Sequence, residues 1–314
     1  MASNKLISII IPVFNREETL ERLFNSLRSI TYQPLEIILV DNASKDSSLR
    51  LCQHFKTELQ DKPGISVILA IEETPGACAC RNTGIHLSTG EYLYFFDSDD
   101  EISPSFFDEI APFLDKYDMI CAPTTMIFED GQKKVRDCIP TALPYDHIIS
   151  ASLSTQTMVI RKSLLLQVGE WDANLARWND WELGARLLCA QPKVKWLTDK
   201  PYHLIYQHAK SISGKPLADD YEQLVKSLKK VELNIKSSSL KEEIKTRSLN
   251  SLSSKALLLS ASLYKSGAKR KAHEMNKYAS DLSQTRTFKW LSPLIYCFSK
   301  HRVPGMWRLY RRII

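Results

Sequence analysis

The clearest candidate for chemistry in this sequence is the acidic run Asp97-Ser98-Asp99-Asp100. Side chains two apart on an extended segment point the same way, so Asp97 and Asp99 can converge on one ligand. Carboxylates are hard oxygen donors, and Mg²⁺ or Mn²⁺ binds through one or two of them together with substrate phosphates. Taken alone, the run is equally consistent with a solvated acidic turn before a helix that begins near Ser103.

Three isolated residues could add contacts to a phosphorylated ligand. Arg81, in a predicted helix, can pair with phosphate oxygens through two parallel hydrogen bonds, although a single arginine is more often a surface residue. Asp41 could accept hydrogen bonds from a base or ribose, or it could be a turn residue before a helix cap at Ser44. His208 could be a ligand-binding residue, although a lone histidine is more often a packing or surface residue.

Tryptophans flank another acidic residue, farther along the chain. Asp180 opens a predicted helix, where it could be an N-terminal cap or a partner of the helix dipole, a contribution of ~1 kcal/mol. The neighbouring Trp171, Trp178 and Trp181 favour a second interpretation, in which flat apolar walls surround a partly desolvated carboxylate. A carboxylate in such surroundings is suited to act as a general base.

The segments that must position these residues alternate between strand-like and helical patterns. Short apolar runs predict strands at Leu6–Ile11, Leu35–Val40, Ile65–Ala70 and Tyr92–Phe96. Amphipathic spacing predicts helices between them, at Glu17–Ile30, Ser44–Leu59 and Ala77–Ser88. This alternation predicts an α/β fold with a mostly parallel sheet sandwiched by helices. Ligands bind at the carboxyl ends of such strands, which is where Asp41 and Asp97 stand.

The second half of the chain becomes helical. Weaker patterns predict strands at Met119–Ala122 and Met158–Ile160 and a helix at Trp181–Cys189. From residue 217 onward, Lys241–Tyr264 and Ala268–Leu282, separated by Gly267, predict a helical hairpin. We therefore expect a large domain at 1–215, a helical hairpin extension at 216–284 and a basic aromatic tail at 285–314.

Composition narrows the classes of protein. The hydrophobic and charged fractions, 44% and 25%, are ordinary for a globular protein. No apolar segment approaches the roughly 20 residues of a membrane span, and the N-terminus is too polar for a secretory signal. Seven scattered cysteines indicate a reducing compartment, and we interpret Cys78 and Cys80 as packing residues.

The net charge of +6 is concentrated at the C-terminus. Residues 285–314 contain seven Lys or Arg and no acidic residue, which leaves about −1 for residues 1–284 and argues against a nucleic-acid-binding surface. Aromatic and aliphatic residues interleave with these charges. The tail is therefore either a segment in the interface of an anionic membrane or a helix that covers an exposed edge of the domain.

Taken in order, the motifs within residues 5–215 resemble those of the inverting family-2 glycosyltransferases of the non-processive bacterial type, which have the GT-A fold. The run from Ile9 to Asn15 looks like the family's opening strand and turn. The segment from Val40 to Ser47 is similar to its second-strand motif, which usually has an aspartate in place of Asn42. Two further motifs are similar to its helix motif and its metal-binding DXD motif: Ala79-Cys80-Arg81-Asn82-Thr83-Gly84 and Asp97-Ser98-Asp99-Asp100.

The resemblance implies transfer of a single sugar from a nucleotide diphosphate donor, usually a UDP-sugar, to a hydroxyl of a glycan or lipid-linked acceptor in cell-surface polysaccharide synthesis. Asp41 would contact the base, and Arg81 would lie along the base and diphosphate. The residues implied in nucleotide binding are Pro12, Phe14, Asn15, Asp41, Arg81, Asp97 and Ser98. The implied ligands of an Mn²⁺ or Mg²⁺ cofactor are Asp99, Asp97 and His208.

Asp180 is implied as the base that takes the proton of the acceptor hydroxyl, with Trp171, Trp178 and Trp181 on the acceptor side. Asn179 stands where the family usually has a glutamate, which affects how the acceptor is positioned. A single displacement with one base inverts the anomeric centre, and a divalent cation stabilises the leaving diphosphate. We expect the protein in the cytoplasm, at the inner face of the plasma membrane if the tail at 285–314 binds lipid.

Other classes of protein fit less well. A nucleotidyltransferase usually carries a Gly-rich phosphate loop after its first strand, where this chain has Pro12-Val13-Phe14-Asn15-Arg16-Glu17. A processive polysaccharide synthase would need membrane spans and a Gln-x-x-Arg-Trp motif, and we find neither in this sequence. The remaining alternative is a membrane-associated scaffold that binds nucleotide sugars without turnover, and the presence of Asp97, Asp99 and Asp180 favours catalysis over it.

Overall fold

The computed structural model describes residues 5–208 and 216–283, so the predicted tail at 285–314 lies outside the described residues. The described residues divide into two compact units. The first unit takes those within Met1–Pro140, Leu153–Ala176 and Pro192–Ala209. The second unit takes those within Thr141–Ser152, Arg177–Gln191 and Lys210–Ile314.

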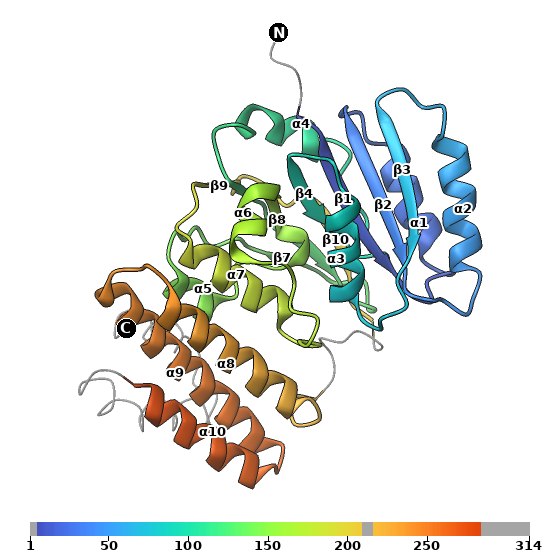
Figure 1. The fold of residues 1–314 in the computed structure, drawn as a ribbon. Coiled ribbons are helices and arrows are strands. Elements are labelled where there is room, and N and C mark those ends of the chain that lie inside the picture. The colour runs from blue at the N-terminus through green and yellow to red at the C-terminus, as the bar shows by residue number, and fades with distance from the viewer. Residues whose placement is uncertain (1–4, 209–215, 284–314) are drawn as a thin grey trace. The chain divides into compact units, whose positions relative to one another are not determined.

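Within the described residues, the first unit is built on a sheet of seven strands in the order β3-β2-β1-β4-β8-β5-β9 (Figure 1). The strands are β1 (Ile7–Val13), β2 (Leu35–Asp41), β3 (Ile65–Ile71), β4 (Tyr92–Phe95), β5 (Met119–Cys121), β8 (Met158–Arg161) and β9 (Val194–Trp196). The first four along the chain are parallel to one another, and β8 runs antiparallel to both of its neighbours. The carboxyl ends of β1, β2 and β4 therefore lie at one edge of the sheet.

Helices cover both faces of this sheet. One face packs against α1 (Leu20–Arg28), α2 (Ser48–Leu59) and α4 (Phe106–Ile110), and the other against α3 (Ala77–Leu87). Side chains such as Ile9 and Ile37 point to the first face, whereas Ile10 lies against Gly84 of α3. Because both faces are covered, β1 and β2 are almost continuously hydrophobic, as is usual for buried parallel strands.

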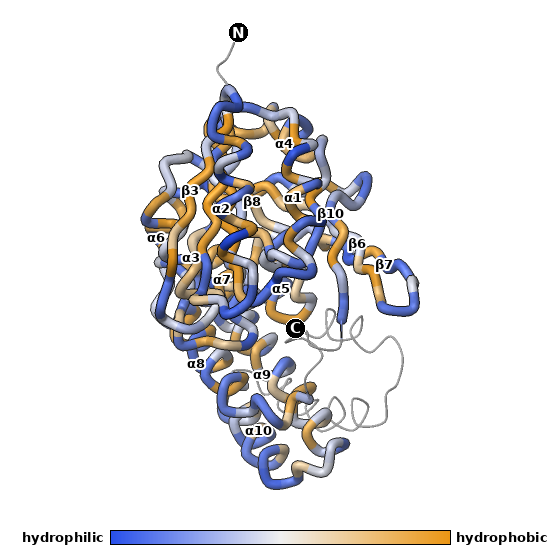
Figure 2. Tube along the Cα trace, turned by 90° about the vertical axis from the view of Figure 1, so that its right-hand side faces the viewer, coloured by the Kyte–Doolittle hydropathy of each residue, from blue (hydrophilic) through white to orange (hydrophobic). Residues whose placement is uncertain are grey.

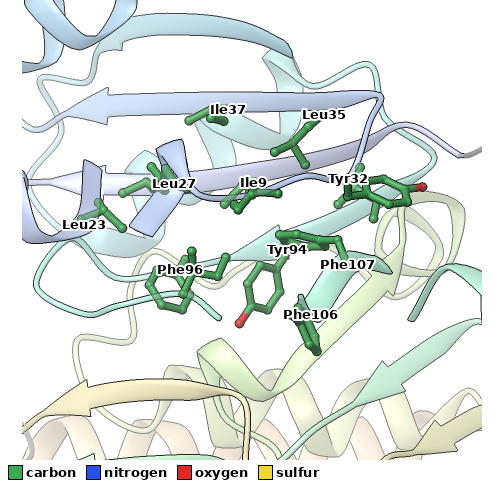
Figure 3. Close-up of a cluster of buried hydrophobic side chains, with 14 of the residues drawn as sticks. Ile9, Leu23, Leu27, Tyr32, Leu35, Ile37, Tyr94, Phe96, Phe106 and Phe107 are labelled. Carbon is green, nitrogen blue, oxygen red and sulfur yellow. The ribbon is translucent and has the colours of Figure 1, made fainter. Parts of the chain in front are cut away.

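A cluster of buried side chains fills the space between the sheet and helices α1, α2 and α4 (Figure 3). The ring of Tyr94 contacts those of Phe96, Phe106 and Phe107, with centroids 5.5 to 5.7 Å apart. The Tyr94 hydroxyl donates a hydrogen bond of 2.8 Å to the backbone carbonyl of Gln156. Through this hydrogen bond, the hydrophobic core fixes the backbone of the polar segment that contains Gln156.

A second, smaller sheet in this unit has the order β10-β6-β7. Its strands are β6 (Thr124–Ile127), β7 (Lys133–Arg136) and β10 (His203–Tyr206). Figure 2 shows hydrophobic colours along the strands of the large sheet and hydrophilic colours at the turn of the β6–β7 hairpin. A short helix, α6 (Lys162–Val168), and two 3₁₀ turns, η1 (Ala111–Phe113) and η2 (Thr155–Thr157), complete the unit.

The second unit is helical. Its helices are α5 (Pro144–Ser150), α7 (Asn179–Cys189), α8 (Tyr221–Ser237), α9 (Glu242–Lys265) and α10 (Lys269–Leu282). α9 and α10 lie side by side (Figure 1), and Ser253 and Ser260 of α9 donate hydrogen bonds of 2.5 and 2.6 Å to carbonyls of α10. In the part of the chain that the structure describes, none of the helices combines the length and apolarity of a membrane-spanning segment.

The predicted α/β fold with a C-terminal helical extension is confirmed, and the main differences lie at the starts of two helices. α1 begins at Leu20 rather than at Glu17, and α2 at Ser48 rather than at Ser44. The residues in front of each helix instead bind the other loop: the Glu17 N–H donates to Asp46 Oδ2 at 3.1 Å, and the Ser47 N–H donates to Glu17 Oε2 at 2.9 Å. These loop contacts replace the expected first helical turns.

Candidate active site

Asp41 is the last residue of β2 and is almost completely buried, with 1% of its surface exposed. Its Oδ2 accepts a hydrogen bond of 2.9 Å from the Ser44 N–H. Its Oδ1 is buried and has no hydrogen-bond partner in the structure. A buried acceptor without a donor is unfavourable by about 1–3 kcal/mol, so Asp41 is poised to accept a hydrogen bond from a ligand.

The loops after β1 and β2 are joined through Asn15. Its N–H donates to Ser44 Oγ at 3.0 Å, and its Oδ1 accepts from the Lys45 N–H at 2.8 Å. Asn15 and Ala43 both have positive φ, 49° and 54°, a conformation that asparagine adopts more readily than most residues. Beside this joint, the ring of Phe14 is 55% exposed, so an apolar surface is available next to Asp41's loop.

The contacts of the Asn42 side chain explain why this chain departs from the family pattern at that position. Its Nδ2 donates to the carbonyls of Glu72 and Thr74 at 2.7 and 2.9 Å, and its Oδ1 accepts from the Gly76 N–H at 2.8 Å. A carboxylate has no proton for the two carbonyls. The amide at Asn42 therefore binds the loop before α3 and is not interchangeable with aspartate here.

Arg81 lies on α3 with only 4% of its surface exposed. Its Nη2 donates to Asp97 Oδ1 at 2.9 Å, and its guanidinium stacks 4.4 Å from the ring centroid of Trp171. Trp171 is held by Asn82, which exchanges two hydrogen bonds of 2.9 and 3.0 Å with its backbone. This arrangement fixes the plane of the guanidinium before any ligand binds.

Gly84 sets the distance between α3 and β1. A Cβ atom at this position would lie 2.3 Å from Ile10 Cγ2, well inside any real contact. The glycine therefore allows the helix that carries Arg81 to approach the sheet closely, and it keeps Arg81 within reach of Asp97.

The side chains of the acidic run after β4 contact different partners and do not form one cluster. Gln156 Nε2 donates to Asp97 Oδ2 at 2.9 Å and to Asp100 Oδ2 at 2.5 Å. Asp100 Oδ1 accepts from the Tyr206 N–H at 2.7 Å. Burial, together with the charges of Asp99 and Asp97, raises the pKa of Asp100 well above its usual range. The hydrogen bonds of Asp100 thus give it a structural role in the run.

Gln156 was missed by the sequence analysis. It is buried on η2, in a polar stretch whose Ser154 and Thr157 form a reciprocal capping box. Its distance along the chain from Asp97 leaves no local pattern that could have revealed the contact.

Asp99 points to a different set of partners. Its Oδ2 lies 3.0 Å from His208 Nε2 and 3.1 Å from Arg16 Nη2, and its backbone carbonyl accepts a hydrogen bond from Arg22. The structure therefore brings Asp99 and His208 together, whereas Asp97 faces Arg81 and Gln156.

The described residues contain no group of three or more His, Cys, Asp or Glu side chains that could hold a metal. One carboxylate oxygen and one imidazole nitrogen in contact nevertheless fit a divalent cation that takes its other ligands from phosphates and water. Two of the predicted nucleotide contacts are Pro12 and Ser98. Pro12 is a residue of β1. Ser98 is buried, and its carbonyl accepts a hydrogen bond of 3.4 Å from the Thr19 hydroxyl.

Asp180 belongs to the second unit. It is the second residue of α7, whose N-cap is Trp178, so Asp180 is not itself the cap. Its Oδ1 accepts from the Trp181 N–H at 2.8 Å. Trp181 is buried and donates through Nε1 to the Ile148 carbonyl at 3.1 Å, while the Lys255 ammonium lies 5.0 Å from the Trp178 ring centroid.

Trp178 has a positive φ of 58°, an outlier for a bulky residue. The residue before it is tied down, since Arg177 pairs with Asp220 at 2.5 Å and its carbonyl accepts from Ser227 Oγ at 2.7 Å. The start of the helix that carries Asp180 is therefore held by α8.

Solved structures resemble this chain over nearly its whole length. Staphylococcus aureus TarS 1-349 in complex with UDP-GlcNAc matches with a TM-score of 0.64 and 18% identity, covering 96% of this chain and 91% of that one. The mannosyltransferase PcManGT from Pyrobaculum calidifontis in complex with GDP-Man and Mn²⁺ matches with a TM-score of 0.58 and 13% identity, covering 99% and 84%. The architecture is the GT-A fold of nucleotide-diphospho-sugar transferases.

Sequence comparison identifies the family within that fold. Residues 8–163 match glycosyl transferase family 2. Over 98 residues the chain is 38% identical to the poly(ribitol-phosphate) beta-glucosyltransferase of Bacillus spizizenii, which covers 31% of this chain and 15% of that protein. Such matches span between 14% and 53% of the lengths of the curated relatives. The chain belongs to glycosyl transferase family 2.

Proposed function

We propose that this chain is an inverting glycosyltransferase that moves one sugar from a nucleotide diphosphate, in the first place a UDP-sugar, to a hydroxyl of a glycan or lipid-linked acceptor in cell-surface polysaccharide synthesis. The observation that carries the proposal is the buried, unpartnered Oδ1 of Asp41 at the same sheet edge as Arg81 and the acidic run. TarS in complex with UDP-GlcNAc and the glucosyltransferase of B. spizizenii support the choice of donor class and of a polymer acceptor.

In this proposal the nucleoside binds over the loops after β1 and β2. Asp41 Oδ1 accepts a hydrogen bond from the base, because uracil N3–H is a donor and this oxygen has no other partner. Phe14 supplies an exposed apolar surface for the flat base, and Asn15 holds the two loops together. Pro12 of β1 and the buried Ser98 complete the set of residues that we assign to nucleotide binding.

The diphosphate binds near Arg81, Asp97 and Asp99. The Arg81 guanidinium pairs with phosphate or stacks along the base, and Asp97 contacts the ribose while it holds Arg81. Asp99 and His208 would hold Mn²⁺ or Mg²⁺, and we assign Asp97 as a further carboxylate ligand from the same run. When bound, such a cation stabilises the negative charge that develops on the leaving diphosphate.

We assign the acceptor step to Asp180. Its carboxylate takes the proton of the acceptor hydroxyl while that oxygen bonds to the anomeric carbon and the carbon–diphosphate bond breaks. Attack from the face opposite the leaving group inverts the anomeric centre. Trp178, half-buried and two residues before Asp180, offers an apolar wall for a sugar ring, and Trp171 and Trp181, both buried, are the other tryptophans we assign to the acceptor side.

Thermal unfolding with UDP, GDP and CDP, each with and without Mn²⁺, tests the donor site. A ligand at about 100 times its dissociation constant stabilises the native state by roughly 2.7 kcal/mol, which gives a readable shift. We expect a Mn²⁺-dependent shift with one nucleotide, lost in Asp99→Ala and retained in the control Asp61→Ala, an exposed carboxylate after α2. If none of the nucleotides shifts the wild type, the donor site is refuted. If binding is present but no sugar is ever transferred, the scaffold alternative replaces it.

A membrane location is a separate part of the proposal. It rests on the composition of residues 285–314, where seven basic residues interleave with aromatic ones. Sedimentation with anionic liposomes should deplete the full chain and leave a chain ending at Thr285 in the supernatant. Equal binding of the two proteins would refute this part and leave the donor site untouched.

A further inference from the structure

The guanidinium of Arg16 contacts the same Asp99 carboxylate that we assign to binding of the divalent cation. Arg16 lies in the loop between β1 and α1, and its Nη2 lies 3.1 Å from Asp99 Oδ2. The same carboxylate oxygen lies 3.0 Å from His208 Nε2. The two oxygens of Asp97 are engaged elsewhere, by Arg81 and Gln156.

The backbone of Arg16 is fixed, but its side chain is not enclosed. The Arg16 N–H donates to Ser48 Oγ at 2.7 Å, and its carbonyl accepts from the Thr19 and Leu20 N–H groups at 2.9 and 3.0 Å. The side chain is 35% exposed, compared with 14% for that of Asp99. The guanidinium can therefore leave Asp99 without moving the loop.

Arg22 is a contrasting neighbour. Its guanidinium donates to the Asp99 carbonyl, stacks 3.7 Å from the centroid of the Tyr206 ring and lies 3.9 Å from Glu101. These three contacts hold Arg22 in place. Arg22 therefore helps to hold the acidic run in place. The more exposed side chain of Arg16 contacts the run through its ion pair with Asp99.

A divalent cation at Asp99 would share an oxygen with this guanidinium. Carboxylate–Mg²⁺ distances are about 2.0–2.1 Å, so an unmoved Arg16 would lie within a few ångströms of the ion, and the two positive charges would repel. The diphosphate that accompanies the ion supplies the anionic oxygens that a guanidinium prefers. Arg16 then has a new partner close to the one it loses.

We propose that Arg16 competes with the divalent cation for Asp99 Oδ2, and that an arriving nucleoside diphosphate frees the carboxylate by taking over the guanidinium. This inference rests on the proposed donor site. It makes Arg16 a binding residue for the diphosphate and couples the nucleotide to the metal. By linkage, the nucleotide tightens metal binding by the same factor by which the metal tightens nucleotide binding.

The test measures the two ligands separately. Mn²⁺ alone is titrated into wild type, Arg16→Gln and the control Arg28→Gln, with free Mn²⁺ followed by electron paramagnetic resonance. UDP alone, without metal, is titrated by calorimetry into the same proteins. Arg28 is a matched control because its guanidinium also pairs with carboxylates, those of Glu21 and Glu58.

We expect Arg16→Gln to bind Mn²⁺ about fivefold more tightly and UDP about fivefold more weakly than wild type, the factor for a partly exposed ion pair of ~1 kcal/mol. Arg28→Gln should match the wild type, and Arg16→Lys should partly restore both effects. An unchanged Mn²⁺ affinity in Arg16→Gln would overturn the competition, and an unchanged UDP affinity would overturn the exchange. If wild type binds no nucleoside diphosphate, the proposed function fails, and the Mn²⁺ titration still decides whether Arg16 competes.

Discussion

His203, the first residue of β10, provides a direct test of the first unit's core. Its ring is fully buried among aromatic rings, the nearest being Phe106 at 4.5 Å between centroids. Its Nδ1 accepts a hydrogen bond of 3.1 Å from the Ser103 N–H, so the proton of the neutral ring is on Nε2. A second proton on Nδ1 would face that N–H donor. Burial lowers the pKa of His203 to about 3.

The sign of the effect follows from proton linkage. In the unfolded chain the pKa is about 6.5, so between pH 6.5 and 3 the unfolded state binds a proton that the native state does not. This contribution is complete above pH 6.5 and is lost as the pH falls towards 3. Between pH 7 and pH 5 the loss amounts to about 2 kcal/mol of unfolding free energy.

The matched variant is His203→Asn, since an asparagine Oδ1 can still accept the Ser103 bond but does not titrate. Urea unfolding at pH 7, 6 and 5 should give the variant a lower stability at pH 7, by about 2–3 kcal/mol, because a buried ring is removed. At pH 5 the two proteins should be nearly equal, because all other titrating groups are shared. Parallel losses in both proteins from pH 7 to pH 5 would refute the reasoning.

Three further substitutions test the contacts that position the site, each by urea unfolding and UDP titration. Gln156→Leu removes the donor between Asp97 and Asp100, and we expect a loss of about 2–4 kcal/mol and weaker UDP binding. Gly84→Ala places a Cβ against Ile10 and should destabilise by about 1–3 kcal/mol despite its better helix propensity. Asn42→Asp, although it restores the usual family residue, removes two donated hydrogen bonds and should lower stability by about 1–2 kcal/mol.

Each of these expectations has an outcome that contradicts it. A fully stable Gln156→Leu protein would mean that the two carboxylates do not depend on the amide. A stable Gly84→Ala protein would mean that α3 can move away from β1 without consequence. A gain of stability in Asn42→Asp would mean that the carbonyls of Glu72 and Thr74 have other donors.

The sequence was sufficient where local patterns determine structure. The apolar runs of β1 to β4 and the spacing of the helices between them predicted the α/β core, because β1, β2 and β4 are buried on both faces and are therefore almost continuously apolar. The positions of Asp41 and Asp97 at strand ends followed from the same reasoning. The helical hairpin of α9 and α10 around Gly267, which has a φ of 86°, was also predictable.

The remaining features depend on contacts between distant segments. Gln156 reaches Asp97 and Asp100 from a short polar turn that has no periodic pattern. Arg16 pairs with Asp99 only because β1 and β4 are neighbours in the sheet. The small strands β6, β7 and β10 are only partly buried, so their sequences lack the apolar run that marks the buried strands of the large sheet.

Calorimetric titration of UDP, GDP and CDP into wild type and Asp41→Asn, with Mn²⁺ present, tests the donor site most directly. The asparagine can keep the Ser44 bond through its oxygen, but it presents an NH₂ group instead of the unpartnered carboxylate oxygen. The account predicts that one nucleoside diphosphate binds with a stoichiometry of about 1 and that the substitution weakens it at least ~10-fold, as the loss of a hydrogen bond to a charged group does. Equal affinity in the two proteins, or no binding of any of the three nucleotides, would contradict it.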